Sequence, residues 1–418
     1  MAVFKSFHAV RPLPQYAAEV AALPYDVMNS AEAREMVKGK PNSFLHVDKA
    51  EIDLQPDTNL YSPDVYLKAK ENLNKLAADG ICKEDKQSSV YIYRQIMNSR
   101  SQTGLVGCVS IDDYLNNKIK KHELTRADKE ADRINHVDIC DANTGPIFLT
   151  YREDKNISAI VENFKNNNEP VYDFVTAEGI SNTVWVVESP ELIAKITEMF
   201  AKTDYLYIAD GHHRAASAVK VGQKRREAKP DFTGEEEFNF FLAVAFPQNE
   251  LAIMDYNRLI KDLNGLSPEE FLKKVGEKFT VEAAKPGEPY KPGEKQTFGM
   301  YLQGKWYKLK AKEGTFDKEN PVERLDVSIL QNNLISPILG IDDPRIDKRI
   351  DFVGGIRGLG ELERRANADM VMAFSMYPTT LDDLMAIADA DEIMPPKSTW
   401  FEPKLLSGLF VHKLNSNS

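Results

Sequence analysis

The sequence predicts an α/β protein with mixed sheets and two domains, on three grounds: its length, its composition and its succession of strand-like and helix-like segments. A domain commonly holds about 150 residues, so 418 residues exceed what one hydrophobic core usually organises. Hydrophobic residues make up 42% of the chain and charged residues 28%, as in ordinary globular proteins. We place the domain boundary near Tyr256, which gives domains of residues 1–255 and 256–418.

Apolar periodicity and turn residues define the elements of the first domain. Residues 11–14 and 23–27 are expected to be irregular connections, because a residue that precedes proline favours extended backbone. We predict helices at 62–76, 118–139, 191–200 and 214–221. We predict strands at 89–95, 104–111, 147–151, 171–175, 183–187 and 205–209, and two strands that pair with each other at 238–246 and 251–254.

The second domain also mixes helices and strands. We expect a helix to begin at Ser267-Pro268-Glu269-Glu270, because serine, proline and glutamate are common in the first turn of a helix. Residues 299–309 have the pattern of a hairpin that turns at Gln303 and Gly304. A further strand is expected at 370–374.

Charge and cysteine content restrict the compartment and the partners. A net charge of −11 repels a phosphate backbone, and no basic run interleaved with aromatic residues offsets it, so we predict no nucleic-acid partner. Cys82, Cys108 and Cys140 have no metal-knuckle spacing and are expected to be reduced, structural thiols. The chain lacks a signal-peptide pattern and a long apolar run, which predicts a soluble cytoplasmic protein without a membrane partner. The oligomeric state stays open.

The principal candidate site follows the strand expected at 205–209. There the chain runs through Asp210 and Gly211 directly into a helix, whose first amides favour an anion. Gly211 permits a sharp turn and a close approach to a ligand. His212, His213 and Arg214 add hydrogen-bond donors at the same helix end. The pattern predicts a phosphate-binding site in which Asp210 orients a histidine or holds a metal ion.

Two other readings of this motif remain. The histidines could cap the helix while Arg214 pairs with a surface acid. Zinc is less favoured, because adjacent histidines point to different sides of the backbone and no third ligand has zincin spacing. The metal requirement therefore stays open.

A second group of candidate residues lies in the charged segment 118–139. On a helix, His122, Arg126, Lys129 and Arg133 recur at i, i+4, i+7 and i+11, which gives one cationic stripe. Aspartates and glutamates occupy the intervening positions. The alternative is therefore a solvated helix held by ion pairs, which charge pattern alone favours.

A third group lies close to the C-terminus. Lys397, Ser398 and Thr399 sit in a loop bounded by prolines at 395, 396 and 403. Proline reduces the conformational freedom that a loop loses on ordering, which suits a loop that presents Lys397 and Thr399 to an anion. A purely structural role suits the same stiffness equally well.

Four motifs in this order carry a family resemblance: Leu23-Pro24-Tyr25-Asp26-Val27, then His122-Glu123-Leu124-Thr125 with Lys129 and Asp132-Arg133, then Asp210-Gly211-His212-His213-Arg214, then Met394-Pro395-Pro396-Lys397-Ser398-Thr399. With them the chain resembles the domain of unknown function 1015 (DUF1015) family, of the ParB/sulfiredoxin-like superfamily, which is related to free-serine kinases. The resemblance implies a ParB/sulfiredoxin-like phosphate-binding portion at 1–255. It also implies an α/β domain at 256–418 that contributes the Lys-Ser-Thr loop.

The same resemblance implies a function in serine metabolism. The relatives with assigned chemistry phosphorylate the hydroxyl of free L-serine, so we expect a kinase for serine or a similar small hydroxy metabolite. The expected donor is ATP, ADP or pyrophosphate with Mg²⁺. Gly211, His213 and Arg214 would bind its phosphates, and Asp26 or Glu123 would serve as the base. The serine kinases are described with a glutamate base, so Asp26 departs from their pattern.

Other activities stay open or are disfavoured. A nucleotide-binding regulatory protein without turnover, or a phosphoester hydrolase with water as acceptor, would use the same cationic site. Sulfiredoxin chemistry needs a cysteine beside the turn, and no cysteine follows Cys140. The chain has no Walker motif, and the glycines at 354–360 lack the protein-kinase continuation.

Overall fold

The computed structural model describes residues 2–415, and their contacts divide the chain into two compact units. The first unit contains Met1–Leu251 together with Pro403–Ser418, and the second contains Ala252–Glu402. The chain therefore leaves the first unit near the boundary expected at Tyr256 and returns to it at Pro403. The second domain predicted at 256–418 includes this returning segment, because nothing in its residues signals a return.

A nine-stranded mixed sheet forms the centre of the first unit, in the order β6-β11-β8-β12-β5-β4-β10-β9, with β1 paired to β5. Two pairs, β11 with β6 and β12 with β8, are parallel, and the other pairs are antiparallel. The strands are β1 (Phe4–Lys5), β4 (Val90–Met97), β5 (Arg100–Ser110), β6 (Ile119–Lys120), β8 (Ile147–Tyr151), β9 (Tyr172–Val175), β10 (Ser181–Val187), β11 (Leu206–Asp210) and β12 (Phe240–Pro247). This arrangement confirms a mixed α/β protein.

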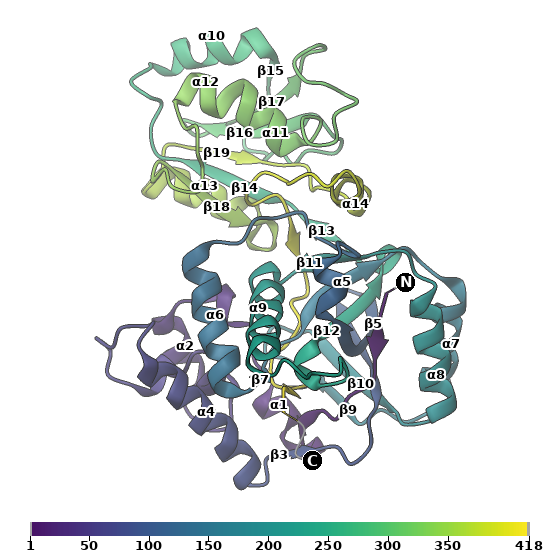
Figure 1. Cartoon of the computed structure of the whole chain (residues 1–418). Coiled ribbons are helices and arrows are strands. Elements are labelled where there is room, and N and C mark those ends of the chain that lie inside the picture. The colour runs from purple at the N-terminus through teal and green to yellow at the C-terminus, as the bar shows by residue number, and fades with distance from the viewer. Residues whose placement is uncertain (1, 416–418) are drawn as a thin grey trace. The chain divides into compact units, whose positions relative to one another are not determined.

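Side-chain alternation along β4 explains why both faces of this sheet are buried. Val90 and Ile92 point into the main core, which also contains residues of α7 (Lys155–Asn167) and α8 (Pro190–Ala201). Figure 1 shows these two helices along one flank of the sheet. Tyr91 and Tyr93 point the opposite way, and their rings contact the ring of Phe410 from the returning C-terminal segment.

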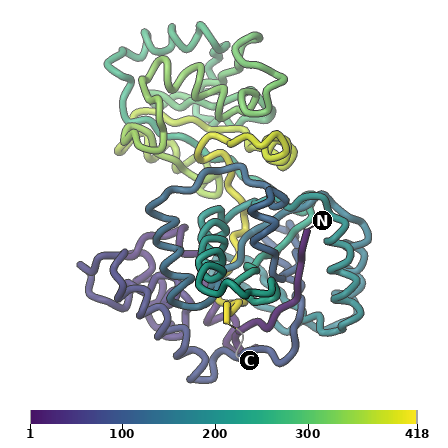
Figure 2. Tube along the Cα trace, in the orientation of Figure 1, coloured from purple at the N-terminus to yellow at the C-terminus, as the bar shows by residue number. Residues whose placement is uncertain are grey.

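The returning segment is built into the first unit by backbone pairing. Val411 pairs with Val10, Ser407 pairs with Ala22, and β21 (His412–Lys413) pairs with β7 (Ala142–Asn143). Figure 2 shows this yellow end of the trace running among the elements of the first unit.

Five helices of the first unit, α2, α3, α4, α6 and α9, pack beside one another near the candidate site. The helix α4 (Pro63–Ala78) begins with proline in its first turn, as predicted, and packs on α6 (Ala127–Cys140) through Ala69 and Cys140. In turn, α6 contacts α9 (His212–Ala228) through Val137 and Val221. The short helices α2 (Ser30–Met36) and α3 (Leu45–Asp48) complete this side. Thus α6 and α9, which carry the predicted site residues Lys129, Arg133, His212, His213 and Arg214, lie next to each other.

The second unit has a six-stranded antiparallel sheet, ordered β15-β17-β16-β19-β14-β18. Its strands are β14 (Tyr256–Ile260), β15 (Phe279–Ala283), β16 (Thr297–Leu302), β17 (Lys305–Ala311), β18 (Ile350–Gly354) and β19 (Met372–Ser375). The helices are α10 (Pro268–Lys278), α11 (Asp326–Leu330), a π-helical segment (Gln331–Ile335), α12 (Ser336–Leu339), α13 (Gly358–Ala368) and α14 (Leu381–Asp389). The predicted hairpin is confirmed, with Gln303 and Gly304 at φ 50° and 75° as a tight hairpin turn requires.

Two local predictions were wrong. The helix expected at 118–139 begins only at Ala127, because residues 119–120 instead pair with β11 as the strand β6. The segments 238–246 and 251–254 are strands but do not pair with each other. Instead, β12 lies between β5 and β8, and β13 (Ile253–Met254) pairs with β20 (Trp400–Phe401).

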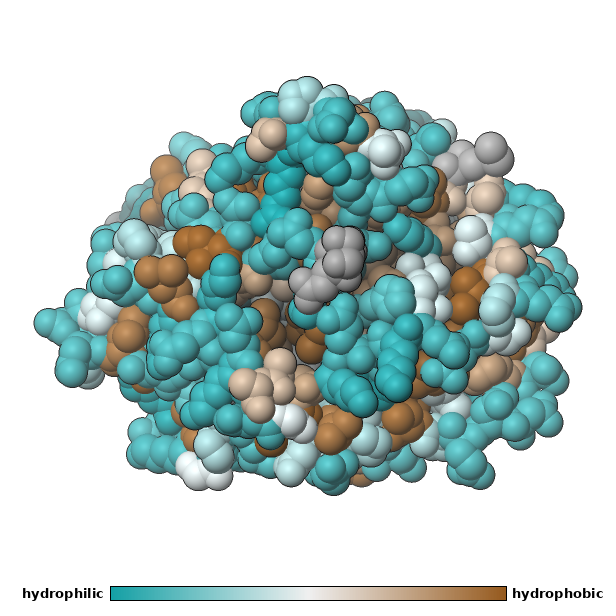
Figure 3. All heavy atoms as spheres, turned by 60° about the horizontal axis from the view of Figure 1, so that its bottom comes forward, coloured by the Kyte–Doolittle hydropathy of each residue, from teal (hydrophilic) through white to brown (hydrophobic). Residues whose placement is uncertain are grey.

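The surface, the cysteines and the helix lengths bear on the features that the sequence predicts. On the face shown in Figure 3, hydrophilic side chains predominate and apolar ones are scattered. Cys82, Cys108 and Cys140 are buried free thiols, as predicted. Across the described residues, every helix is too short or too polar to span a membrane.

Candidate functional site

The turn between β11 and α9 has the strand–turn–helix form that the sequence predicts. Gly211 occupies the N-cap position with φ +93°, a conformation that favours glycine, and it has no side chain to cap the first amides of α9. A Cβ atom at this position would lie 3.3 Å from Nε of Arg214. Glycine is therefore needed both for the backbone conformation and for the space that the Arg214 guanidinium occupies.

Asp210 binds a lysine from the returning segment. Its Oδ2 accepts a hydrogen bond from Nζ of Lys404 at 2.9 Å, and its Oδ1 accepts one from the Gly211 amide at 2.9 Å. Burial alone would raise the pKa of this carboxyl, but Lys404, Arg214 and the amide hold it well below its usual range. Asp210 is therefore an anion paired with Lys404, and no hydrogen bond joins it to a histidine within residues 2–415.

Arg214 lies mostly buried behind the turn. Its Nη1 donates to the Pro146 carbonyl at 2.7 Å, and its Nη2 is 3.8 Å from Oδ2 of Asp26, a side chain that is 41% exposed. Its Nε is buried and has no hydrogen-bond partner among the described residues. Burial lowers the pKa of Arg214, but the carboxylates of Asp26 and Asp210 outweigh it, so the guanidinium stays charged.

A small cavity of about 20 Å³ lies beside Arg214 and is lined also by Tyr25, Asp48 and Arg133. Arg133 is buried, stacks over the Tyr25 ring at 4.1 Å and forms an ion pair with Asp132 at 2.9 Å. Burial raises the pKa of Asp48, whose Oδ1 accepts a hydrogen bond from Thr144. A cavity of this volume admits about one water molecule.

His122, Glu123 and His212 come together on the other side of the turn. The rings of His122 and His212 are 4.5 Å apart, edge to face, and Nδ1 of His212 is 3.7 Å from Oε2 of Glu123. One potential ligand atom from each of the three residues lies within 4.8 Å of the others. Burial lowers the pKa of His122 to about 4 and, together with His122, lowers the pKa of His212, so both rings are neutral near pH 7.

The parallel pairing of β6 with β11 explains this meeting of distant residues. In its register, Ile119 lies opposite Leu206 and Lys120 opposite Tyr207, so the segments that follow the two strands run side by side. Sequence reasoning missed the contact, because it placed His122 on a helix and sought a third metal ligand at short spacing. A strand signal at residues 119–120 is too brief to find from periodicity.

The cationic stripe predicted on one helix does not exist. His122 precedes α6 and is buried, whereas the Arg126 side chain is 65% exposed and pairs with Asp128. The Arg126 amide donates to Nε2 of His213 at 3.0 Å, which fixes that ring at the start of α9. Lys129 lies over the Tyr61 ring at 5.8 Å, while Arg133 is buried. Because α6 begins at Ala127, these four side chains do not share one helix face.

The loop with Lys397, Ser398 and Thr399 belongs to the second unit and is held there. The Lys397 carbonyl accepts a hydrogen bond from Arg258 at 3.1 Å, and the Ser398 hydroxyl donates to the Pro395 carbonyl at 2.6 Å. Lys397 adopts φ 60°, and its ammonium lies 5.5 Å from the Tyr256 ring. Its role in binding phosphate stays a prediction.

The ligand atoms around the turn suit some cofactors better than others. Two imidazoles and a carboxylate are ligands for transition metals, whereas Mg²⁺ prefers oxygen ligands in octahedral geometry. The cluster of His122, Glu123 and His212 therefore does not fit Mg²⁺. The uncapped amides of α9 and Arg214 are suited to a phosphate group.

Comparison with solved structures found distant matches. A free serine kinase in complex with AMP is 15% identical, with a TM-score of 0.38, and the match covers 74% of this chain and 90% of that chain. A conserved hypothetical protein from Pyrococcus furiosus is 15% identical, with a TM-score of 0.36 and coverage of 73% and 94%. SbnI with C-terminal truncation from Staphylococcus aureus is 11% identical, with a TM-score of 0.38 and coverage of 75% and 90%.

Comparison of the sequence itself gives a family. A search of curated proteins found no match. Residues 4–328, however, match the family described as "Protein of unknown function (DUF1015)", and this range is more than half of the chain. It includes the segments 23–27, 122–133 and 210–214 that carried the resemblance in the sequence. The chain therefore belongs to the DUF1015 family.

Proposed function

We propose that this protein is a phosphotransferase that phosphorylates the hydroxyl of free L-serine or a similar small metabolite. One observation carries the proposal: an uncapped helix N-terminus, the buried guanidinium of Arg214 and the carboxylate of Asp26 converge at the Gly211 turn. Phosphoryl transfer requires cationic binding of the donor, in-line placement and a base, and little covalent chemistry from the protein.

The donor would be ATP, ADP or pyrophosphate, and its phosphates would lie on the solvent side of the turn. The cavity behind the turn, about 20 Å³, is too small for a phosphate group. His213 is partly exposed and Asp26 is exposed, and the first amides of α9 have no side-chain cap and would donate to a phosphate there. Mg²⁺ would be held mainly by the donor phosphates and water, as this cation prefers.

Asp26 is our candidate for the base. In the proposed step its carboxylate takes the proton of the acceptor hydroxyl, the hydroxyl oxygen forms a bond to the transferred phosphorus, and the bond from phosphorus to the donor oxygen breaks. The leaving group is the shortened nucleotide or inorganic phosphate. Asp26 is preferred to Glu123 because it faces Arg214, whereas Glu123 faces His212.

The test is direct product formation. Purified protein would be incubated with L-serine, Mg²⁺ and ATP, ADP or pyrophosphate in turn, and phosphoserine would be measured by mass spectrometry. Replacing Asp26 by asparagine is expected to reduce kcat by roughly 100-fold or more, as loss of a general base does. Asp79→Asn, at an exposed acid after α4, is the matched control and should leave kcat unchanged.

Other results would replace the proposal. If no donor gives phosphoserine or another phosphorylated hydroxy metabolite, the kinase assignment is wrong. Release of phosphate from phosphoserine without an acceptor would indicate a hydrolase. Nucleotide binding in calorimetry without turnover would indicate a regulatory protein.

A further inference from the structure

Two buried histidines in the first unit have ring nitrogens without hydrogen bonds. His122 and His212 are 1% and 5% exposed. Both ring nitrogens of His122 and Nε2 of His212 have no hydrogen-bond partner among the described residues. Buried polar atoms in native proteins nearly always have a partner, and each exception indicates a missing water, ion or ligand.

The geometry of these rings points to a cation. With one carboxylate oxygen from Glu123, the potential ligand atoms lie within 4.8 Å of one another. Ligand atoms around a tetrahedral metal ion lie roughly 3.4 Å apart, given metal–ligand distances of about 2.1 Å. Small rotations of the His122, Glu123 and His212 side chains would bring their ligand atoms from within 4.8 Å to this spacing. The Ile208 carbonyl beside His122 suits the outer hydrogen bond that a metal-bound imidazole commonly makes.

We propose that His122, Glu123 and His212 bind a divalent transition metal such as Zn²⁺ or Mn²⁺. Neutral imidazoles and a carboxylate are the ligands that these ions prefer. The Glu123 side chain is 43% exposed, so water or a ligand oxygen can reach a fourth position. This metal site does not depend on the phosphotransferase activity, because metal binding is measured without nucleotide or serine.

The alternative is that the two rings only pack against each other. Edge-to-face contact of aromatic rings is common in protein cores and stabilises them modestly. With the Ile208 carbonyl beside one His122 nitrogen, that account still leaves the other His122 nitrogen and Nε2 of His212 buried without a partner, whereas a metal ion between the rings gives one nitrogen of each ring a ligand role. Direct binding measurements distinguish the two accounts.

The experiment uses the full chain, stripped with a chelator and titrated with Co²⁺ and Zn²⁺. We expect one Co²⁺ per chain, with visible absorption from ordered nitrogen and oxygen ligands, displaced by Zn²⁺ and unaffected by excess Mg²⁺. Glu123→Gln and His212→Gln should each weaken binding on the order of 100-fold. His136→Gln changes a buried histidine that donates to the Val47 carbonyl and should bind Co²⁺ normally.

Two outcomes would overturn the metal site. One is that no stoichiometric Co²⁺ or Zn²⁺ binds to the folded chain. The other is that Glu123→Gln, at a partly exposed position that folding tolerates, binds both ions as tightly as the parent protein does. Either result would leave the two histidines as a packing contact.

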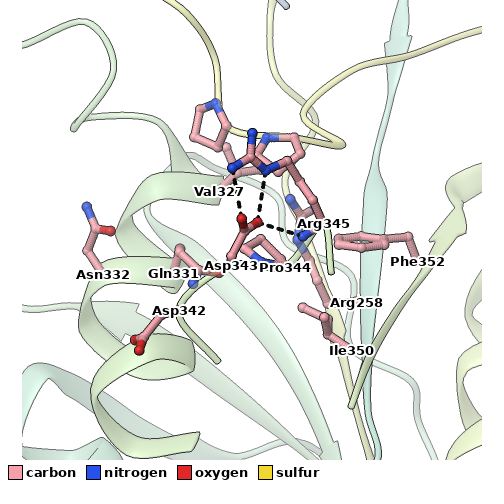
Figure 4. A pocket seen from close by; sticks show the side chains of 12 residues that line it. Arg258, Val327, Gln331, Asn332, Asp342, Asp343, Pro344, Arg345, Ile350 and Phe352 are labelled. Carbon is pink, nitrogen blue, oxygen red and sulfur yellow. Dashed lines mark hydrogen bonds and ion pairs between the residues drawn. The ribbon is translucent and has the colours of Figure 1, made fainter. Parts of the chain in front are cut away.

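A separate observation concerns Arg258 in the second unit. Its side chain lines a cavity of about 340 Å³, together with Gln331, Phe352 and Pro395, and the charged side chains of Asp342, Asp343 and Arg345 line the same cavity. Arg258 is 4% exposed, and its guanidinium donates only to the carbonyls of Tyr256 and Lys397 and lies 5.5 Å from the Phe352 ring. Among residues 2–415 no carboxylate forms an ion pair with it. Of the lining aspartates, Asp343 is paired with Arg345 at 2.8 Å (Figure 4), and Asp342 accepts a hydrogen bond from the Ser336 hydroxyl.

Burying a cation without a paired carboxylate costs folding free energy. The cavity beside Arg258 would let an anion reach the guanidinium and pair with it. Its volume matches that of a small-molecule pocket, which combines apolar walls with few convergent polar groups. The π-helical segment Gln331–Ile335 contributes to this wall, and such segments are frequent at functional sites. We infer that this pocket binds a small organic anion through its carboxylate or phosphate group, with Arg258 as the paired cation.

The probes for this pocket are succinate and phosphoserine, each titrated into the full chain by calorimetry. We expect one of them to bind, which also distinguishes a carboxylate ligand from a phosphate ligand. Replacing Arg258 by methionine should abolish that binding. Arg349→Met, which removes an arginine of the same unit paired with Asp347, should leave it intact. Failure of both probes at millimolar concentration, or equal binding by the Arg258→Met variant, would overturn the assignment.

Discussion

Arg214 in the first unit and Arg258 in the second are both largely buried, but the charges around them differ. Arg214 has the carboxylates of Asp26 and Asp210 nearby, which raise its pKa although burial opposes them. Arg258 forms no ion pair with a carboxylate in the described part of the chain, and burial lowers its pKa to about 10. In the first unit a ligand must compete with acids already present, whereas in the second an anion would supply a missing partner.

The same contrast holds for buried acids. Asp210 is paired with Lys404, and its pKa lies below the usual range. Asp326 in the second unit is 8% exposed, both of its carboxylate oxygens accept from the Gln296 amide, and burial raises its pKa to about 7. Asp210 thus has its charge balanced by a paired cation within the first unit. Among the described residues of the second unit, Arg258 and Asp326 are buried charged groups that form no ion pair, whereas the buried Asp255 and Asp383 pair with lysines.

Removing Arg214 should have the largest effect. Arg214→Met leaves the Pro146 carbonyl without its donor and removes one of the two cations that hold the buried Asp210 ionised, and removing the cation from a buried charge cluster destabilises a protein by about 3 kcal/mol. We expect a loss of this size in urea denaturation, with faster hydrogen exchange in α9. Lys202→Met, at an exposed pair with Glu198, should change stability by less than about 0.5 kcal/mol. Equal losses in the two variants would refute the internal balance of charge.

Asp326 should make the stability of the second unit depend on pH. Its folded pKa of about 7 lies above the ordinary value of 3.8, so the folded state binds more protons between these values. Stability is greatest below about pH 4 for this group and falls as pH rises through 7, by up to about 4 kcal/mol.

Asparagine at position 326 isolates this effect. Asp326→Asn keeps an oxygen for the Gln296 amide and stays neutral, so the decline between pH 4 and 7 should disappear from thermal denaturation of the second unit. Asp369→Asn, at an exposed acid paired with Arg365, should retain the decline. An unchanged pH profile in Asp326→Asn would mean that another group titrates in this window.

How far the sequence predicts the molecule depends on the range of the contacts. The β16–β17 hairpin follows from local turn chemistry at Gln303 and Gly304, and β8 was predicted at its observed bounds because its apolar run is bounded by turn residues. The strand, turn and helix around Gly211 were likewise predictable, since each depends on neighbouring residues. Local sequence signals thus predicted the strand, the turn and the helix that form the candidate site.

The contacts that complete the site depend on distant residues. The pairing of Asp210 with Lys404 joins residues 194 positions apart and requires the chain to return to the first unit. The meeting of His122 with His212 requires β6, a strand of two residues with too little periodicity to detect. The prediction of a cationic stripe was wrong for a related reason, because the spacing of charged residues does not show where α6 begins.

Arg258→Met should have the smallest effect on stability and thereby sharpen the comparison with Arg214→Met. The variant removes a buried cation that has no carboxylate, so the relief of desolvation offsets the loss of two hydrogen bonds to backbone carbonyls. We expect a change within about 1 kcal/mol in calorimetric unfolding, although the same variant abolishes anion binding. A loss as large as that of Arg214→Met would mean that the cation has an acidic partner in solution. In that case the pocket would have no unpaired charge to offer a ligand.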